Sequence, residues 1–354
     1  MEQNILNISY HPFELLFRYP FRIAHGERTF TPVVFVEIAH NGLLGYGEAA
    51  LPPYLAETTK TVGSFLESSK PLLKKLNDNF SLEELELFLI NLNEAFPGNK
   101  SAKAALEMAL LDLWGKKNNL SLKKIFNPHS LPDVFSTFTI GICGPEEMKL
   151  KISGANEFSI FKIKLNGISD KKNIELFLNI SERMKSNRKV SFCVDVNQGW
   201  KDKFLAMDMV HWLSEKGAFL IEQPLPVKML DESAYLTERS PIPVIADESV
   251  QGLEDIEKVK GAFSGINIKL MKTGGLYIAK KMISRARELE MKILIGCMSE
   301  SSCGVTAAAH LSPLADWADL DGPYLIKNDP FEGVKIKDGK IWLPDEPGMG
   351  VKKN

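Results

Sequence analysis

Five ionisable residues recur along the middle of the chain, each at the end of a short apolar run that precedes helix-like sequence. They are Lys164, Asp195, Glu222, Asp247 and Lys269. Three carboxylates could supply the hard oxygen ligands that Mg²⁺ prefers, and this ion usually keeps positions open for water or substrate. Two lysines beside such an ion could move a proton. The set therefore indicates one metal-dependent site assembled from successive strands.

A simpler reading exists for each residue taken alone. A charge at a strand end is usually an ordinary surface group, and an acid there can cap the next helix, as Asp247 beside Ser249 could do. Five such residues in one series, with three acids between two lysines, favour a shared site. Without a cation the three acids would repel one another and their pKa values would rise.

The apolar runs predict a (β/α)8-type barrel. They are short, rich in Val, Ile and Phe, and bounded by turn residues. Their starts lie roughly 20 to 30 residues apart, and barrels of this type carry their chemistry at the carboxyl ends of the strands. The predicted strands are residues 135–142, 158–165, 190–196, 218–221, 243–246, 264–270, 292–296 and 317–320.

A chain of 354 residues is too long for a barrel alone, so we expect a second domain. We predict an α+β capping domain over residues 1–125, the barrel over 126–328, and a return to the cap over 329–354. The cap should contain strands 5–10, 13–17, 33–39 and 43–49, then helices 58–76, 81–93 and 101–118. The tail should form a hairpin from 334–336 and 341–343, packed on the cap.

Composition narrows the functional class. The net charge of −2 gives no electrostatic case for binding nucleic acid or an anionic membrane. No basic leader or membrane-length apolar run is visible, so we expect a cytoplasmic protein. We also expect a homo-oligomer. The four cysteines show no metal-binding spacing, and we expect buried free thiols. They are Cys143, Cys193, Cys297 and Cys303.

The lysines suggest the reaction. Lys162 and Lys164 lie two residues apart on one strand and share a face, while Lys269 lies four strands further round, on the opposite wall. A free lysine, with a pKa near 10.4, is a poor base, but a nearby cation and a second ammonium would lower that pKa. Two opposed amines could then act on the two faces of one carbon. Abstraction of a proton beside a carboxylate gives an enediolate, which Mg²⁺ can stabilise.

These motifs resemble an ordered signature of the enolase superfamily, in its muconate-lactonizing enzyme subgroup. The matching segments are Lys162-Ile163-Lys164, Asp195-Val196-Asn197, Glu222-Gln223-Pro224, Asp247-Glu248-Ser249 and Asn267-Ile268-Lys269-Leu270. The resemblance covers nearly the whole chain and implies a (β/α)7β barrel under an α+β cap. It implies that the three acids bind Mg²⁺, that Lys164 and Lys269 are the acid/base pair, and that Lys162 assists Lys164.

The last predicted strand points to one activity in that subgroup. Asp319-Leu320-Asp321 resembles the motif of the dipeptide epimerases, in which two acids on one face hold the α-ammonium of a dipeptide. The alternative is an acidic turn before Gly322. Met298 and Ser299, after the seventh strand, would line the substrate channel. The resemblance thus implies inversion at the α-carbon of the C-terminal residue of a small-molecule dipeptide.

Side-chain preference should come from a mobile cap loop near residues 21–31. Epimerases that act on Ala-Glu carry an arginine there, but the matching position is Gly26, with Arg22 and Arg28 close by. We therefore expect a substrate with small or apolar side chains. His25 could contact that substrate, or it could pack within the loop.

Other functions stay open from the sequence. The same signature serves N-acylamino acid racemases, o-succinylbenzoate synthases and cycloisomerases. A non-catalytic barrel could bind a cationic ligand at Asp319 and Asp321. An aldolase using one lysine would leave the acid cluster unexplained, and a mandelate racemase-type dehydratase would need a histidine that residues 297–302 lack.

Overall fold

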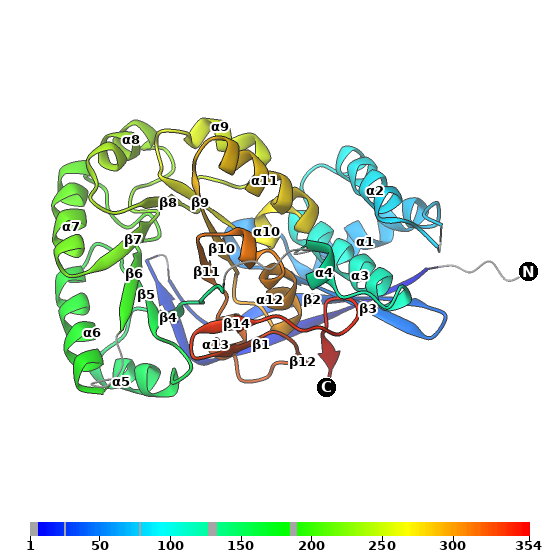
Figure 1. The fold of residues 1–354 in the computed structure, drawn as a ribbon, viewed down its shortest axis with the longest axis horizontal. Helices are drawn as coiled ribbons and strands as arrows, with labels where there is room; N and C mark the ends of the chain where they lie inside the picture. The colour runs from blue at the N-terminus through cyan, green and yellow to red at the C-terminus, as the bar shows by residue number, and fades with distance from the viewer. Residues whose placement is uncertain (1–5, 25, 78, 127–132, 185–189) are drawn as a thin grey trace, which may run out of the picture.

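The structure is a computed structural model that describes residues 6–24, 26–77, 79–126, 133–184 and 190–354. Its larger part is a parallel barrel with helices outside it, and its smaller part is a cap built from the N-terminal segment (Figure 1). This is the (β/α)-barrel and α+β cap that the sequence predicts. None of the described helices combines the length and the apolar character that crossing a membrane would require.

The barrel contains all eight predicted strands, in sequential parallel order. The first and last are joined by a bridge between Ser136 and Ala318, and the Thr137 amide donates to the Ala318 carbonyl at 3.1 Å. This contact closes the ring, so every strand end faces one centre. The strands are β4 (Phe138–Ile140), β5 (Ile160–Lys164), β6 (Ser191–Asp195), β7 (Ala218–Glu222), β8 (Val244–Ala246), β9 (Gly265–Ile268), β10 (Lys292–Gly296) and β11 (Trp317–Asp319).

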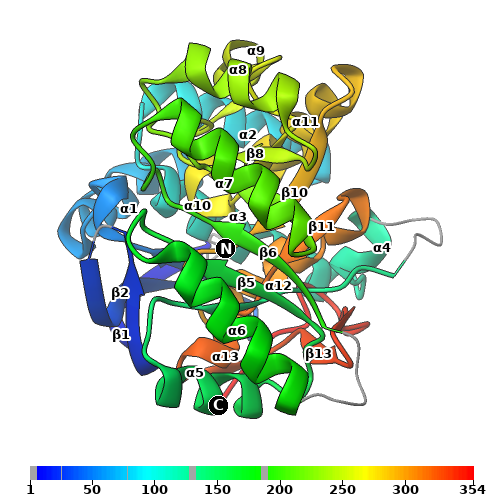
Figure 2. The same ribbon diagram turned by 90° about the vertical axis from the view of Figure 1, so that its left-hand side faces the viewer.

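Helices cover the outside of the barrel (Figure 2). The helix α11 shows why: Leu276, Ala279 and Ile283 recur at helical spacing and are buried against the strands, while charged residues face outward. The barrel helices are α5 (Pro145–Gly154), α6 (Asp170–Met184), α7 (Lys203–Glu215), α8 (Leu230–Arg239), α9 (Ile256–Val259), α10 (Leu270–Thr273), α11 (Leu276–Glu288), α12 (Ser302–Ala309) and α13 (Gly322–Leu325). Short 3₁₀ turns η2 (Leu253–Asp255) and η3 (Ser312–Leu314) lie between them.

The cap sheet has three antiparallel strands rather than four. They are β1 (Asn7–Ile23), β2 (Gly26–His40) and β3 (Leu43–Ala50). The prediction of separate strands at 5–10 and 13–17 was wrong, because β1 runs through Pro12 without a break. An edge strand tolerates proline, since one side of its backbone needs no sheet partner. The predicted loop at 21–31 is also wrong, because β1 and β2 continue as a hairpin.

The helices of the cap are α1 (Thr59–Leu73), α2 (Leu82–Ala95), α3 (Lys100–Lys117) and α4 (Leu122–Phe126), after the turn η1 (Pro53–Leu55). Helix α3 is buried on nearly all sides, because it lies between the cap sheet and the barrel. A Cβ at Gly47 would lie 1.9 Å from the Ala105 carbonyl oxygen, so only glycine permits this approach of β3 to α3.

The tail divides its contacts between the two domains. The hairpin of β13 (Lys335–Lys337) and β14 (Lys340–Trp342) pairs with the segment that precedes β4 at the amino end of the barrel, where the Ser136 backbone amide donates to the Gly339 carbonyl at 2.9 Å. This part of the predicted docking on the cap was wrong. The ends of the tail do reach the cap: β12 (Phe331–Glu332) pairs with β15 (Lys352–Lys353), and Phe331 contacts Phe35 at 5.1 Å between ring centres.

Candidate active site

Strand register places the first members of the site at one level. Lys164 is the partner of Asp195 across β5 and β6, and Asp195 is the partner of Glu222 across β6 and β7. Asp247 and Lys269 follow the last residues of β8 and β9. All five therefore lie at the carboxyl ends of adjacent strands, where the barrel prediction placed them.

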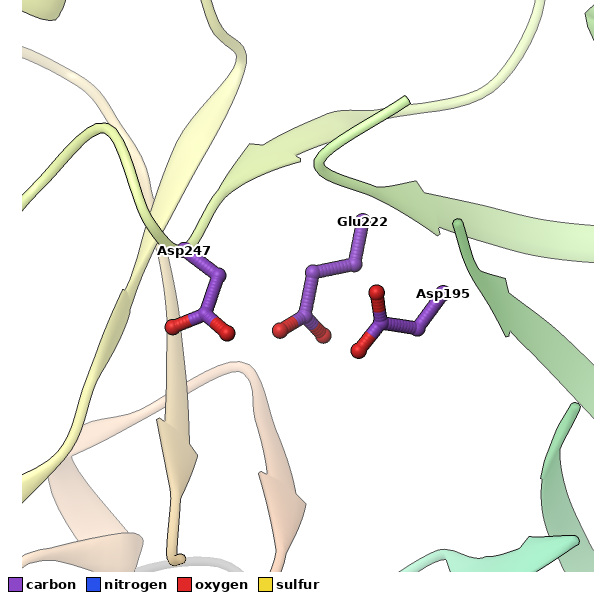
Figure 3. A group of neighbouring side chains, drawn as sticks. All are labelled: Asp195, Glu222 and Asp247. Carbon is purple, nitrogen blue, oxygen red and sulfur yellow. The ribbon is translucent and has the colours of Figure 1, made fainter. Parts of the chain in front are cut away.

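The three acids converge. Asp195, Glu222 and Asp247 each offer an oxygen, all within 4.8 Å of one another, and Figure 3 shows their carboxylates turned into one space. All three are buried, with no more than 2% of any residue exposed. Neighbouring residues fix their orientation. The Asn197 backbone amide donates to Asp195 at 2.9 Å, and the Asn267 side-chain amide donates to Glu222 at 2.8 Å.

The lysines contact opposite ends of this cluster. Lys164 Nζ lies 2.6 Å from Asp195 Oδ2, whereas Lys269 Nζ lies 2.6 Å from Asp247 Oδ2. Their strands, β5 and β9, are separated by three others, so the two amines stand on opposing walls. Lys162 Nζ lies beneath, 2.7 Å from Glu222 and 3.4 Å from Asp195.

Burial and charge set the protonation of the cluster. Burial, with the charges of Asp195 and Asp247, raises the pKa of Glu222 to about 7 despite the ammonium of Lys162. For Lys269, burial by itself would lower the pKa, but the Asp247 carboxylate raises that pKa well above its usual value. This direction is opposite to the one expected from the sequence, because the lysine is paired with an acid.

Asp319 and Asp321 form a second acidic group at the end of β11. Asp319 accepts from Lys162 at 2.7 Å and from the Thr137 hydroxyl at 2.5 Å. Asp321 accepts from the Thr139 amide at 2.5 Å, and burial together with Asp319 raises the pKa of Asp321 to about 7. Among the described residues, no lysine forms an ion pair with Asp321. Its carboxylate is therefore available to a ligand cation.

A cavity of ≈ 390 Å³ connects these groups under the cap. Its walls include most of the residues expected from the sequence, whereas Asp195 and Glu222 lie below its surface. The predicted residues that line it are Lys162, Lys164, Asp247, Lys269, Met298, Ser299, Asp319, Asp321 and Gly26. Tyr54 closes the cap side and donates to Met298 Sδ at 2.7 Å.

The β1–β2 hairpin forms the remaining wall. Arg28 lines the cavity, and its guanidinium lies 5.9 Å from the Phe17 ring centre and 6.0 Å from that of Phe21. Arg22 instead pairs with Glu27 at 2.6 Å and with Glu147 at 2.9 Å. Of the two arginines, only Arg28 faces the cavity. His25, expected as a substrate contact, lies outside the described residues.

Three residues that contact the site were not expected from the sequence. Lys272 is fully buried and donates to Asp247 Oδ1 at 2.6 Å and to the Asn267 carbonyl at 2.9 Å. Its place three residues after Lys269 was the available signal. Thr137 and Thr139 lie two residues apart, one just before β4 and one within it, ahead of the barrel helix α5; this is the period-two pattern of an inward face.

The cysteines take no part in a disulfide among the described residues. Cys193, Cys297 and Cys303 are buried as expected, but Cys143 is half-buried and departs from the prediction. Cys297 lines the cavity, and burial raises the pKa of its thiol well above the usual value. Its thiol is therefore held in the protonated form and is a poor nucleophile.

Known families match both parts of the chain. The N-terminal domain of the mandelate racemase/muconate lactonizing enzyme family matches residues 10–126, and the enolase C-terminal domain-like family matches residues 147–354. The chain belongs to the mandelate racemase/muconate lactonizing enzyme family. Membership in the enolase superfamily, inferred above from the strand-end motifs, is thereby confirmed.

Individual relatives sharpen the comparison. The L-Ala-D/L-Glu epimerase of Bacteroides thetaiotaomicron is 45% identical over 98% of this chain and 88% of its own. The substrate-liganded L-Ala-D/L-Glu epimerase from Bacillus subtilis superposes with a TM-score of 0.89 at 28% identity, covering 99% of both chains. A dipeptide epimerase from Enterococcus faecalis, complexed with Mg and L-Leu-L-Tyr, gives 0.88 at 26% identity, covering 99% of both.

The acid cluster fits the magnesium seen in such relatives. Its donors are all carboxylate oxygens, converging and buried, and the Asn197 side-chain oxygen is a further buried acceptor without a hydrogen bond among the described residues. Hard oxygen donors favour Mg²⁺ over softer transition metals. Asp195, Glu222 and Asp247 are thus the residues that would hold the ion.

Proposed function

We propose that this protein is a Mg²⁺-dependent dipeptide epimerase that inverts the α-carbon of the C-terminal residue. One observation carries the proposal: Lys164 and Lys269 approach a single buried acid cluster from opposing walls of one cavity. Dipeptide epimerisation is also the activity named for relatives that match nearly the whole chain.

The catalytic roles follow from this geometry. One lysine, in its neutral form, takes the α-proton from one face of the carbon, and the other, as an ammonium, returns a proton to the opposite face. Bound Mg²⁺ would supply positive charge where negative charge develops on the substrate carboxylate. Lys162, paired with Glu222 and Asp319 at 2.7 Å, favours the ionised form of both acids beside the reacting centre.

The dipeptide's α-ammonium is assigned to Asp319 and Asp321. This pair lies close to the acid cluster, because the Lys162 ammonium contacts both Asp319 and Glu222 at 2.7 Å. A substrate that places its carboxylate at the cluster and its ammonium at this pair must carry both charges. An N-acyl amino acid or a lactone offers no cation for Asp321, so these alternative substrates fit less well.

Arg28 favours an acidic side chain on the C-terminal residue, as in L-Ala-L-Glu. The Arg28 side chain is half-buried, lines the cavity and makes no ion pair with any described residue, while burial lowers its pKa. A carboxylate supplied by the substrate would satisfy it. The expectation of a small or apolar side chain, based on Gly26, is the competing prediction.

The test is exchange of the substrate α-hydrogen in deuterated buffer. With Mg²⁺ present, L-Ala-L-Glu should gain one deuterium at the glutamate α-carbon and form L-Ala-D-Glu, as read by mass spectrometry and chiral chromatography. An L-Ala-L-Leu control separates the two side-chain predictions. Absence of exchange over a broad set of dipeptides would refute the function. The cytoplasmic location and the homo-oligomer stay predictions.

A further inference from the structure

A second cavity, of ≈ 340 Å³, lies beside the active cavity. Phe21, Thr139 and Leu325 line both cavities, so the two cavities meet at these residues. Among the described residues, neither the acid cluster nor the three barrel lysines line the second cavity. It therefore adjoins the site without containing any of the groups that carry out the reaction.

The place where the two cavities meet lies at the Asp319–Asp321 end of the active cavity. Thr139 donates its backbone amide to Asp321 at 2.5 Å, and its hydroxyl lies 3.5 Å from Asp319. These are the acids assigned to the substrate ammonium. In an amino-acid residue the side chain begins two bonds from that nitrogen, or about 2.5 Å away. The side chain of the N-terminal residue must therefore start close to Thr139.

The lining of the second cavity selects by chemistry. Phe17 and Phe138 are buried, and the Tyr324 ring is held in place by its hydroxyl, which donates to the Ile336 carbonyl at 3.2 Å. No carboxylate of a described residue lines the cavity; its cations are Arg18, which is exposed, and Lys151, which is paired with Glu147 at 2.8 Å. A cationic side chain would find no partner there, whereas an apolar or aromatic one would contact aromatic rings.

We propose that the second cavity is the subsite for the side chain of the N-terminal residue, and that it admits large apolar residues such as leucine or phenylalanine. This inference rests on the proposed function, because it uses the ammonium position at Asp319 and Asp321. It makes the N-terminal position of the substrate broad, while Arg28 restricts the C-terminal position.

The test is a bulky substitution at a residue that lines the second cavity and does not line the active cavity. Gly154, at the end of α5, lines only the second cavity, and a Cβ there would meet no atom within 4 Å. Gly154→Trp should therefore fold and narrow the subsite. Ser153→Trp is the matched control, because Ser153 is exposed on the same helix and does not line the cavity. Each protein is assayed with L-Phe-L-Glu and L-Ala-L-Glu.

The measured quantity is the ratio of the two kcat/KM values within one preparation, which cancels any loss of folded protein. The wild-type ratio should lie within about tenfold of unity, the size of effect that fit of an apolar side chain can produce. Gly154→Trp should lower that ratio at least tenfold, and Ser153→Trp should keep it.

A wrong subsite assignment can be distinguished from a wrong proposed function. If L-Ala-L-Glu is epimerised and L-Phe-L-Glu is not, or if Gly154→Trp leaves the ratio unchanged, the subsite is refuted and the epimerase stands. If neither dipeptide nor any other exchanges its α-hydrogen, both proposals fall together.

Discussion

The acid cluster stands on adjacent parallel strands of a closed barrel, whereas Arg28 reaches the same cavity from an antiparallel hairpin of the cap. Each cluster residue is held by a neighbour in the same sheet, as the paired positions of Lys164 and Asp195 show. The hairpin is held by a few long-range contacts, among them the Ile142 amide donating to the Arg22 carbonyl at 3.0 Å. We therefore expect the chemistry to depend on the barrel and the specificity to depend on the cap hairpin, which can vary without disturbing the barrel.

Loss of either opposed lysine should produce the largest effect. Lys164→Ala or Lys269→Ala removes one proton-transfer group, so epimerisation should fall by about 10³-fold, within the range known for general acid–base groups. Activity is followed by chiral chromatography of the product. Lys149→Ala, on the exposed surface of α5, is the control. Rapid inversion by either active-site variant would break the assignment of the barrel as the chemical centre.

Removal of the metal should have a comparable effect and should be reversible. Chelation with EDTA should abolish turnover and added Mg²⁺ should restore it, since the three acids are the only described group that could hold a metal ion. Glu222→Gln should weaken Mg²⁺ binding in calorimetry and lower activity by about 10²-fold. Ligand binding indifferent to Mg²⁺ and to both lysines would instead favour a non-catalytic barrel.

A change at Arg28 should alter preference more than chemistry. Arg28→Met should lower kcat/KM for L-Ala-L-Glu by about 10²-fold, the order expected when a buried charge pair loses one partner, with a much smaller change for L-Ala-L-Leu. Arg22→Met is the matched control, because Arg22 pairs with Glu27 and Glu147 outside the cavity. Equal losses for both dipeptides would show that Arg28 only supports the hairpin.

The smallest effect should be a pH dependence of substrate capture. The pKa of Asp321 is raised to about 7, and only its ionised form, which prevails above that pH, attracts an ammonium. As pH falls below 7, kcat/KM should drop towards tenfold per unit. Asp321→Asn should remove this limb of the profile while lowering the plateau. A profile with the same acid limb in Asp321→Asn would assign that limb to another group.

The barrel could be predicted because its signals are local. Each strand is a short β-branched run, and each site residue ends one, so parallel pairing in sequential order brings Asp195, Glu222 and Asp247 together without further information. The cap hairpin could not be predicted in this way. Pro12, Pro20 and Gly26 are turn signals in sequence, yet Pro12 lies within an edge strand and Gly26 begins β2.

Lys272 and Thr139 illustrate a second limit. Each is an ordinary polar residue in sequence, and its role depends on a partner distant in the chain: Lys272 on Asp247, and Thr139 on Asp321. The direction of the Lys269 pKa was also missed, because it follows from an ion pair at 2.6 Å with Asp247. Pairings of this kind are set by packing between elements and leave no periodic trace.

The order of residue types along the chain by itself determined the barrel, the acid cluster and the two opposed lysines, because strand ends in a sequential parallel sheet must meet at one rim. Only the tertiary structure decided that Arg28 rather than Arg22 faces the cavity and that a second cavity adjoins the Asp319–Asp321 end. Those outcomes depend on how the cap hairpin docks on the barrel, and contacts between residues more than a hundred positions apart determine that docking.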